Sequence, residues 1–269
     1  MVLRLQELGI DVVTYNRTAT AQATASTFEE LVVKLTSPRV IFLMVSASAV
    51  DEVIGKLSLT SGDILIDGGN CFYKDAIRRA NDLKTKSVHF IDCGTSGGLK
   101  GARFGACLML GGDKDIVASL DWLWRSLGTW TYFGPSGAGH FVKMVHNGVE
   151  YGMNQALGEG FEILSKGPYE LDFAKVARSW SRGSVVRGWL VELLAKAFDS
   201  DPKLDQFTGS VGGGETGIWT LKAAKEFGVD AEVIEEAVEA REKSQKNPTF
   251  AGKVVSALRD GYGGHKEPK

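Results

Sequence analysis

The first half of the chain alternates short apolar runs with segments of helical pattern, and this alternation constrains the fold more than any other feature. Residues 40–45 are apolar throughout, as expected of a strand that is covered on both faces. Similar runs occupy residues 11–15, 64–67 and 89–92. Between them we expect helices near residues 28–35, 48–57 and 74–84. Such alternation predicts an α/β, Rossmann-like fold with a doubly wound parallel sheet.

The second half has a different pattern, which predicts an all-α domain. Residues 137–166 read as one long helix, and no strand signal after them is strong. Further helices are expected at residues 172–181, 186–199, 216–227 and 231–246. We therefore predict two domains, a dinucleotide-binding domain over residues 1–134 and a helical domain over residues 135–269. The glycine-rich and charged residues 259–269 are expected to form an extended tail.

Composition is that of a soluble globular protein, with 43% hydrophobic and 24% charged residues. A net charge of -2 gives no reason to expect nucleic-acid or membrane partners. The three cysteines, Cys71, Cys93 and Cys107, follow no metal-binding spacing and indicate a reducing compartment. No apolar run approaches the roughly 20 residues of a membrane span. We expect a cytoplasmic protein without a metal.

A polar stripe runs along the predicted helix of residues 137–166. Its members are Lys143, His146, Asn147 and Glu150. A helix turns by roughly 100° per residue, so these spacings place all four side chains within an arc of about 100°. The stripe combines a potential base, a potential acid and two hydrogen-bonding groups, which suggests a site because burying such groups is costly. A solvated helix face is the alternative.

Three further segments have residue types that bind ligands in α/β folds. Residues 67–70, Asp-Gly-Gly-Asn, follow a predicted strand, where ligands bind at the carboxyl edge of the sheet. Residues 94–98 follow the next strand, and their N–H groups with the Ser96 hydroxyl could form an anion-binding nest. Arg17 lies where an arginine favours NADP and an acidic residue favours NAD. Taken singly, these segments are also typical of turns, flexible loops and surface arginines.

Together and in this order, the segments resemble those of the 6-phosphogluconate dehydrogenases, within the beta-hydroxyacid dehydrogenase superfamily. The segment from His146 to Tyr151 separates this family from the hydroxyisobutyrate dehydrogenases, which share the Ser-Gly-Gly loop and the Lys143/Asn147 spacing. The length is similar to that of the family's short form. The resemblance rests on residues 16–18, 67–70 with Tyr73, Asp75, Arg78 and Arg79, 96–98, 101–103, 139–152, 215–220 and 259–265.

The resemblance implies oxidative decarboxylation of 6-phosphogluconate to ribulose 5-phosphate and CO2 with reduction of NADP, in the pentose phosphate pathway. Lys143 resembles the base that takes the 3-hydroxyl proton, and Glu150 the acid that protonates C1. A lysine has a pKa of about 10.4, so a site must lower that pKa before a lysine acts as a base at neutral pH.

The resemblance also implies the binding residues. Those for substrate hydroxyls and carboxylate are Ser96, Gly97, Gly98, His146 and Asn147, and Asn70 binds the region between substrate and nicotinamide. Those for the phosphate are Tyr151, Thr216, Arg241, Arg259 and His265, and arginine suits phosphate because it forms paired hydrogen bonds. Those for the cofactor, NADP or alternatively NAD, are Asn16, Arg17, Thr18, Val45 and Asn70. In the family Arg259 and His265 come from a neighbouring subunit, so we expect a homodimer or homotetramer with exchanged tails.

Two departures from the family pattern carry expectations of their own. Gly214 stands where many long-form members have a phosphate-binding lysine, which weakens the prediction of tight phosphate selection. The family's first strand and G-x-G-x-x-G loop are not found in residues 1–269. We expect an unfilled slot between strands near Val13 and Val40, caused by a start codon assigned too late or by deliberate truncation. The chain as written should then bind NADP poorly, and a version extended by about fifteen residues should be active.

Two other functions remain open. One is a hydroxyisobutyrate-type dehydrogenase, which oxidises without decarboxylation and needs neither Glu150 nor the phosphate-binding tail. The other is a non-catalytic truncated homologue, which the absent glycine loop favours and the intact helix with Lys143 and Glu150 opposes.

Overall fold

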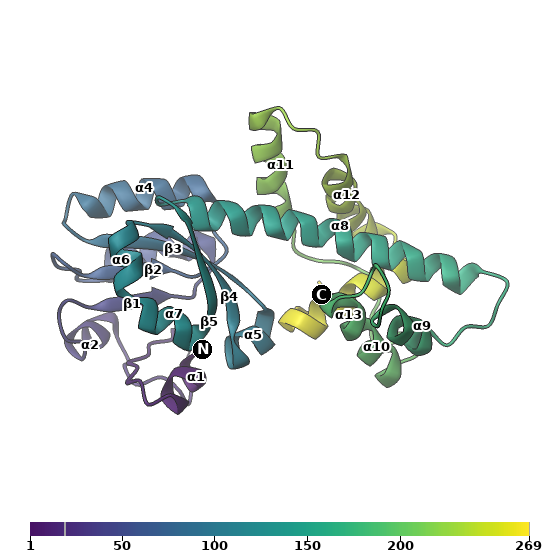
Figure 1. Ribbon diagram of the computed structural model, residues 1–269, viewed down its shortest axis with the longest axis horizontal. Helices are drawn as coiled ribbons and strands as arrows, with labels where there is room; N and C mark the ends of the chain where they lie inside the picture. The colour runs from purple at the N-terminus through teal and green to yellow at the C-terminus, as the bar shows by residue number, and fades with distance from the viewer. Residues whose placement is uncertain (19, 269) are drawn as a thin grey trace. The chain divides into compact units, whose positions relative to one another are not determined.

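A computed structural model describes residues 1–18 and 20–268 (Figure 1). The chain divides into an N-terminal unit, Met1–Val145, and a helical unit, His146–Lys269. One helix, α8 (Ala138–Lys166), begins in the first unit and continues in the second. The predicted domain boundary at residues 134/135 stays a prediction.

The N-terminal unit is built on a five-stranded sheet with the order β1-β2-β3-β4-β5. The strands are β1 (Val40–Leu43), β2 (Ile64–Asp67), β3 (His89–Ser96), β4 (Ala106–Gly112) and β5 (Gly128–Gly134). β1, β2 and β3 are parallel, β4 runs antiparallel to β3, and β5 is parallel to β4. The predicted α/β class is confirmed, although β4 departs from an all-parallel sheet. Its connection from β3 holds only the short helix α5 (Gly98–Phe104), and a parallel crossover needs about a dozen residues or more.

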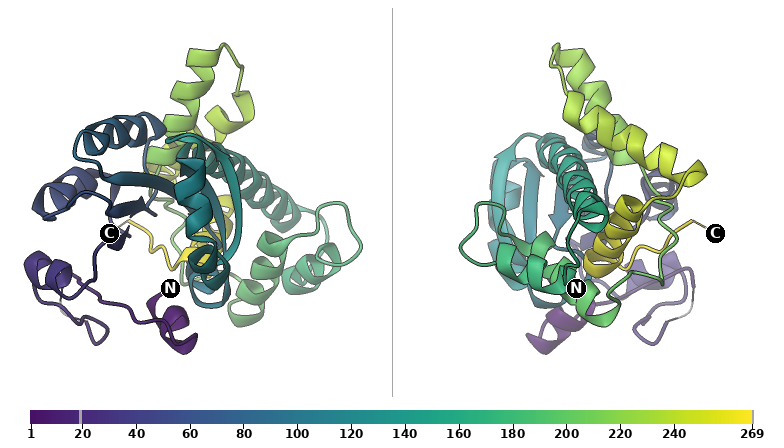
Figure 2. Two further views of the ribbon diagram at one scale, coloured as in Figure 1. Left: turned by 60° about the vertical axis from the view of Figure 1, so that its left-hand side comes forward. Right: turned by 90° about the vertical axis from the view of Figure 1, so that its right-hand side faces the viewer.

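Helices cover both faces of this sheet (Figures 1 and 2). Strand β2 shows why, because Leu65 packs in one apolar cluster while Ile64 and Ile66 pack in the other. The Leu65 cluster includes residues of α2 (Phe28–Val33), α3 (Val50–Lys56) and α4 (Tyr73–Lys84). The second cluster includes residues of α1 (Val2–Glu7), α6 (Lys114–Ser119) and α7 (Asp121–Leu127). Apolar side chains alternate between two faces, which is the doubly wound arrangement that the sequence predicts.

The predicted strand at residues 11–15 is wrong. Only an isolated bridge between Tyr15 and Ala25 forms there. The polar groups of Thr14 are satisfied locally by Thr24, whose backbone N–H donates to the Thr14 carbonyl over 2.9 Å. Among the described residues, β1 pairs only with β2, so this segment has no sheet neighbour to complete a ladder.

The helical unit contains the rest of α8 and five more helices. These are α9 (Phe173–Trp180), α10 (Trp189–Ser200), α11 (Glu215–Phe227), α12 (Glu232–Lys246) and α13 (Phe250–Gly263). Phe161 of α8 is buried against Phe173 and Phe198, with ring centres 5.8 and 5.0 Å away. The all-helical prediction is confirmed. No helix in the described part of the chain is both long and apolar enough to cross a membrane.

Helix α13 corrects the expected extended tail. Residues 259–263 are helical, and only the residues after Gly263 leave the helix. The Thr249 side chain caps α13 by accepting a hydrogen bond from the Gly252 N–H over 3.1 Å. Val254 and Leu258 are fully buried, so packing stabilises the helix along its length.

Candidate functional site

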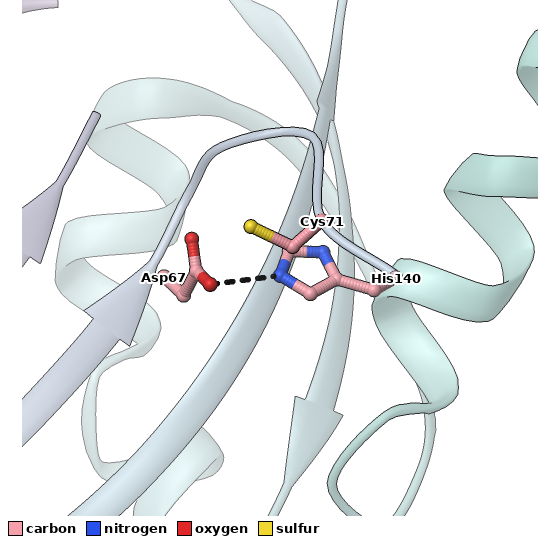
Figure 3. Close-up of side chains that lie close together, drawn as sticks. All are labelled: Asp67, Cys71 and His140. Carbon is pink, nitrogen blue, oxygen red and sulfur yellow. Dashed lines mark ion pairs between the residues drawn. The ribbon is translucent and has the colours of Figure 1, made fainter. Parts of the chain in front are cut away.

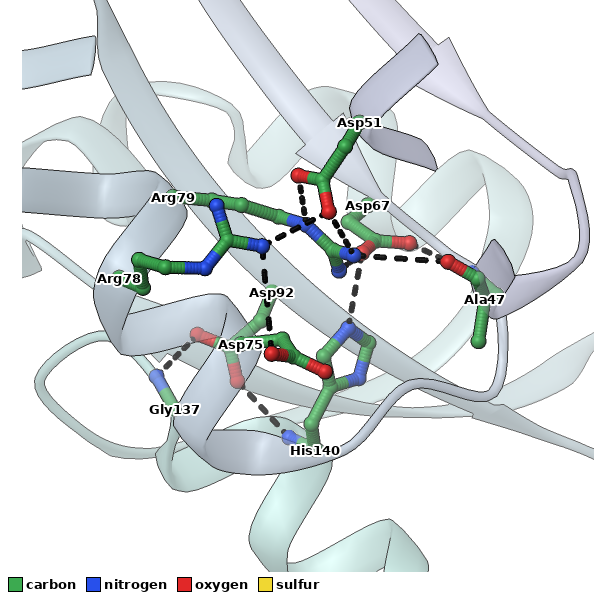
Figure 4. Close-up of polar contacts among 10 residues, drawn as sticks. Ala47, Asp51, Asp67, Asp75, Arg78, Arg79, Asp92, Gly137 and His140 are labelled. Carbon is green, nitrogen blue, oxygen red and sulfur yellow. Dashed lines mark hydrogen bonds and ion pairs between the residues drawn. The ribbon is translucent and has the colours of Figure 1, made fainter. Parts of the chain in front are cut away.

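The first turn of α8 is held on the sheet by the carboxylate of Asp92 in β3 (Figure 4). The Gly137 N–H donates to Oδ1 over 2.7 Å, and the His140 N–H donates to Oδ2 over 2.8 Å. The first N–H groups of a helix have no partner within the helix, so a buried acceptor here replaces the usual local cap. Asp92 is fully buried and was not among the predicted site residues.

Three glycines let this turn approach the strands closely. A methyl group on Gly94 of β3 would overlap Cβ of Lys143 and lie 2.9 Å from the Gly139 carbonyl oxygen. One on Gly111 would lie 2.6 Å from the Asp92 carboxylate, and one on Gly139 would lie 2.7 Å from the Asp92 carbonyl oxygen. The stem of Lys143 is therefore pressed against β3, and the side chain is buried.

A second carboxylate, Asp67 at the end of β2, joins the same turn to its surroundings. Asp67 and Asp92 are partners in the β2–β3 register. Oδ2 of Asp67 lies 3.4 Å from His140 Nε2 and 3.3 Å from Arg79 Nη1, and Oδ1 accepts the Gly69 N–H over 3.2 Å. Burial would raise the pKa of Asp67, but its contacts with His140, Cys71 and the Gly69 amide outweigh burial and lower it. The loop of residues 67–70 is thus tied to the start of α8.

Asp67, Cys71 and His140 form the one group in the described residues with the side chains for a metal site (Figure 3). Their ligand atoms all lie within 4.8 Å of one another. Burial, followed by the charge of Asp67, raises the pKa of the Cys71 thiol to about 12, so it stays protonated and is a poor ligand. The Arg79 guanidinium also contacts the carboxylate oxygen nearest His140. The arrangement does not fit a resident cation.

Arg78 and Arg79, two residues of the segment that resembles the family, link helix α4 to helix α3 beside the end of β2. Arg79 Nε donates to Asp51 Oδ1 over 2.9 Å, and Arg78 Nη2 donates to Asp51 Oδ2 over 2.7 Å (Figure 4). The hydrogen bond from Arg79 is the main cause that lowers the pKa of Asp51 to about 2. These contacts join α4 to α3.

The predicted substrate residues of the N-terminal unit follow neighbouring strands. Asn70 is exposed after β2, and Ser96 ends β3. Gly97 and Gly98 have φ of 121° and 57°, a region that favours glycine, so this turn depends on them. Because β2 and β3 are parallel neighbours, these residues follow strand ends at one edge of the sheet, where ligands bind in such folds.

The predicted cofactor residues are only partly brought together. Val45 follows β1, and a methyl group on Gly69 would lie 2.7 Å from its carbonyl oxygen, so the two loops touch. Asn16, Arg17 and Thr18 are exposed in the irregular segment between α1 and α2.

In the helical unit, α8 presents His146, Asn147 and Glu150. Asn147 is buried, and its Oδ1 lies 3.3 Å from His146 Nδ1. Glu150 Oε1 accepts a hydrogen bond of 2.6 Å from the Tyr262 hydroxyl and a longer one of 3.4 Å from Asn154 Nδ2. Neither Asn154 nor Tyr262 was predicted. Asn154 extends the polar stripe by one turn, a signal that the sequence did contain.

The five predicted phosphate residues lie in the helical unit as a cationic cluster. The Arg241 guanidinium carbon is 3.3 Å from the ring centre of Tyr151, whose hydroxyl lies 3.2 Å from Thr216 Oγ1. Burial lowers the pKa of Arg241, with Arg259 contributing, and burial followed by Arg259 lowers the pKa of His265. Arg241 Nη2 is buried and has no hydrogen-bond partner in the described part of the chain. Such a cluster favours an added anion.

The tail that carries His265 lies against its own unit. The Glu267 carboxylate accepts from the Thr208 and Gly209 N–H groups over 2.8 and 2.9 Å. The glycine turn before α11 also approaches Arg259, since a methyl group on Gly213 would lie 2.9 Å from Arg259 Nη2. Exchange of the tail between subunits stays a prediction.

Two family models match the chain. The NAD binding domain of 6-phosphogluconate dehydrogenase matches residues 1–134, and the 6-phosphogluconate dehydrogenase C-terminal domain matches residues 139–254. A Bacillus subtilis protein, YqeC, whose naming as a 6-phosphogluconate dehydrogenase is itself provisional, is 43% identical over 90% of this chain and 83% of its own. The chain belongs to the 6-phosphogluconate dehydrogenase family.

Other members of the 6-phosphogluconate dehydrogenase family differ in cofactor and length. The NAD(+)-dependent, decarboxylating 6-phosphogluconate dehydrogenase of Haloferax volcanii is 38% identical over 99% of this chain and 93% of its own. The Plasmodium falciparum 6-phosphogluconate dehydrogenase has been solved in its apo form, with NADP+ and with 6-phosphogluconate. Its sequence is 32% identical to this chain, and the two structures superpose with a TM-score of 0.72. That match covers 82% of this chain and 51% of the Plasmodium chain, so this chain spans about half of that enzyme.

Proposed function

We propose that this chain catalyses oxidative decarboxylation of 6-phosphogluconate to ribulose 5-phosphate and CO2, with a nicotinamide dinucleotide as electron acceptor. The observation that carries the proposal is the neighbourhood of Glu150 in the helical unit. An acid there shares its electrostatic environment with Arg241, Arg259 and His265. A dehydrogenase that only oxidises a hydroxy acid needs neither the acid nor the phosphate site.

The side chains divide the reaction into proton transfers and binding. Lys143, in its neutral form, takes the proton of the substrate 3-hydroxyl. The bound dinucleotide supplies the acceptor for the C3 hydride. The resulting 3-keto acid loses CO2 because its carbonyl accepts the electron pair, and protonated Lys143 stabilises the enolate oxygen. Glu150 then gives its proton to the enolate carbon, the former C2, which becomes C1 of ribulose 5-phosphate.

The donor and acceptor groups of the side chains indicate which part of the substrate each one binds. We propose that His146 and Asn147 hold substrate hydroxyls and that the Ser96 hydroxyl with the Gly97 and Gly98 amides holds the carboxylate. Asn70 binds the region between substrate and nicotinamide. Arg241 and Arg259 grip the phosphate, assisted by Tyr151, Thr216 and His265. Their positive charge, gathered in one chain, supports a phosphorylated substrate.

The dinucleotide is held at the edge where β1 and β2 end. Val45 and Asn70 lie on touching loops there, and the absence of a side chain at Gly69 allows that contact. Asn16, Arg17 and Thr18 are proposed to select the adenosine end. Arg17 favours NADP, while the NAD(+)-dependent Haloferax relative supports NAD as the alternative. Comparing kcat/KM for the two cofactors in the wild type and in Arg17→Asp tests this choice.

A stoichiometric assay tests the reaction itself. Purified protein is given 6-phosphogluconate with NADP or NAD, and reduced cofactor and CO2 are measured together. Equal amounts of both products are expected from protein that binds the cofactor. Weak calorimetric binding of NADP, with 6-phosphogluconate bound but not turned over, would instead bear out the poor cofactor binding expected from the glycine loop not found in residues 1–269. Reduced cofactor without CO2 would instead support a hydroxyisobutyrate-type oxidation. Absence of turnover, together with no calorimetric binding of 6-phosphogluconate, would support a non-catalytic homologue. We further propose that the protein acts in the cytoplasm, in the pentose phosphate pathway, as a homo-oligomer.

A further inference from the structure

Among the described residues, the hydrogen bonds of the Glu150 carboxyl group all reach one oxygen, Oε1. The Tyr262 hydroxyl, from α13, donates to Oε1 over 2.6 Å. Asn154 Nδ2, one turn along α8, lies 3.4 Å from the same oxygen and 3.4 Å from the Tyr262 hydroxyl. Three side chains from two helices thus meet at one oxygen atom, and Asn154 is fully buried.

Tyr262 is suited to act as a permanent donor. Burial, followed by the nearby charge of Glu150, raises the pKa of the Tyr262 phenol well above its ordinary value. The phenol therefore keeps its proton throughout the pH range in which a carboxylic acid titrates. The charged groups that surround this pair are Arg241 on α12, Arg259 on α13 and His265 in the tail.

A carboxyl group whose Oε1 already accepts hydrogen bonds carries its own proton on the other oxygen, because the bonded oxygen is the less basic one. We propose that Tyr262, with Asn154, is a positioning residue that holds Oε1 of Glu150 and thereby directs the proton on Oε2 toward the enolate carbon that becomes C1 of ribulose 5-phosphate. This inference rests on the proposed role of Glu150 as the acid.

The Tyr262 ring also makes packing contacts, and an experiment must distinguish their effect from that of the hydroxyl group. The Tyr262 ring lies 6.5 Å from the Trp189 ring and 6.0 Å from the His265 ring, measured between centres. Tyr262→Phe keeps the ring and removes only the donor. The matched control is Tyr132→Phe in the N-terminal unit, where a half-buried tyrosine hydroxyl donates to the Gly112 carbonyl over 3.1 Å.

The first measurement follows exchange of the C1 hydrogens of ribulose 5-phosphate with D2O by proton NMR, with and without reduced cofactor. This exchange is the reverse of proton delivery by Glu150 and needs no net oxidation. We expect Tyr262→Phe to slow exchange and to lower kcat by about tenfold, with little change in KM for 6-phosphogluconate. Tyr132→Phe should match the wild type. Unchanged exchange and kcat in Tyr262→Phe would assign the residue to packing and overturn the proposal.

A second measurement does not depend on turnover. Urea midpoints are compared for Tyr262→Phe, Glu150→Gln and the double variant, with Tyr132→Phe and Glu150→Gln as the control cycle. We expect non-additive midpoints for the Tyr262 cycle and additive ones for the control. If the wild type shows no exchange, the proposed function fails. The Tyr262 cycle still decides the contact, and additive midpoints there would overturn this inference.

Discussion

The first turn of α8 and the cationic cluster of the helical unit differ in how their buried charges are satisfied. In the first turn, the buried Asp92 carboxylate meets two backbone N–H groups over 2.7 and 2.8 Å. In the cluster, Arg241 is buried, one of its terminal nitrogens has no partner in the described residues, and Arg259 adds charge of the same sign. In the first region the charge is matched within the chain, whereas in the second two arginines lie near one carboxyl group, that of Glu150.

The difference separates residues that stabilise the proposed site from residues that are proposed to bind the substrate. A satisfied buried charge stabilises the fold and fixes a direction, while an unsatisfied one costs folding free energy and is retained for binding. Substitutions in the two regions should therefore differ in which quantity they change: stability and kcat for the first, KM for the second.

The largest effect is expected from Lys143→Met, which removes the proposed base but keeps a stem of similar length against Gly94. We expect kcat to fall by about a thousandfold, because general base catalysis contributes about 10²–10⁴. The urea midpoint should change little, since the packing of the stem is kept. Steady-state kinetics and denaturation measure both, and a variant that retains near-normal kcat would remove Lys143 from the mechanism.

Arg241→Met tests the cationic cluster. Losing a charge-assisted phosphate contact should raise KM for 6-phosphogluconate by about a hundredfold, close to 3 kcal/mol of binding. The free energy of unfolding without substrate should change little, because removing a buried guanidinium with an unsatisfied Nη2 offsets the loss of its contact with the Tyr151 ring. A loss of stability that matches the loss of binding would contradict the comparison.

Asp92→Asn tests the first turn of α8, and the chain offers a close control in Asp63. Asp63 is also fully buried and accepts two backbone N–H groups, from Arg39 and Thr60, each over 2.8 Å. It precedes β2, at the end of the strand away from Asp67. Each variant should lose about 1–3 kcal/mol of unfolding free energy.

Only Asp92→Asn should also lower kcat, by about tenfold, because only Asp92 holds the first turn of α8, the helix that carries Lys143 one turn later. Kinetics are compared at equal fractions of folded protein. Equal kcat in the two variants would reduce Asp92 to a stabilising residue.

Local sequence patterns correctly predicted the secondary-structure elements that depend mainly on local sequence. Apolar runs predicted β1, β2 and β3, and the 3.6-residue period predicted α8 with its polar stripe. The run at residues 11–15 also has a strand-like pattern, but a strand needs a neighbour, and pattern alone does not report one.

The missed residues act over long sequence distances. Asp92 caps a turn that begins 45 residues later, and Tyr262 reaches Glu150 across 112 residues. Neither position has a pattern of its own, because its role depends on which strand or helix packs beside it. The phosphate residues were predicted only through the family resemblance and stay a prediction, since isolated arginines read as surface charge.

The smallest predicted effect concerns protons in the cationic cluster. Burial and Arg259 lower the pKa of His265 in the folded protein, so its unfolded form binds protons more readily. The contribution of His265 to stability is therefore present above its unfolded pKa of about 6.5 and is lost as pH falls through the window below it.

A bound phosphate dianion reverses this balance, because it favours the protonated imidazole. Binding of 6-phosphogluconate near neutral pH should then take up a fraction of a proton. Calorimetry in two buffers of different ionisation enthalpy measures that uptake, and His265→Gln should abolish it while weakening binding less than Arg241→Met does. Equal uptake in His265→Gln would move the titration to another group and leave the two arginines as the whole of the cluster's charge.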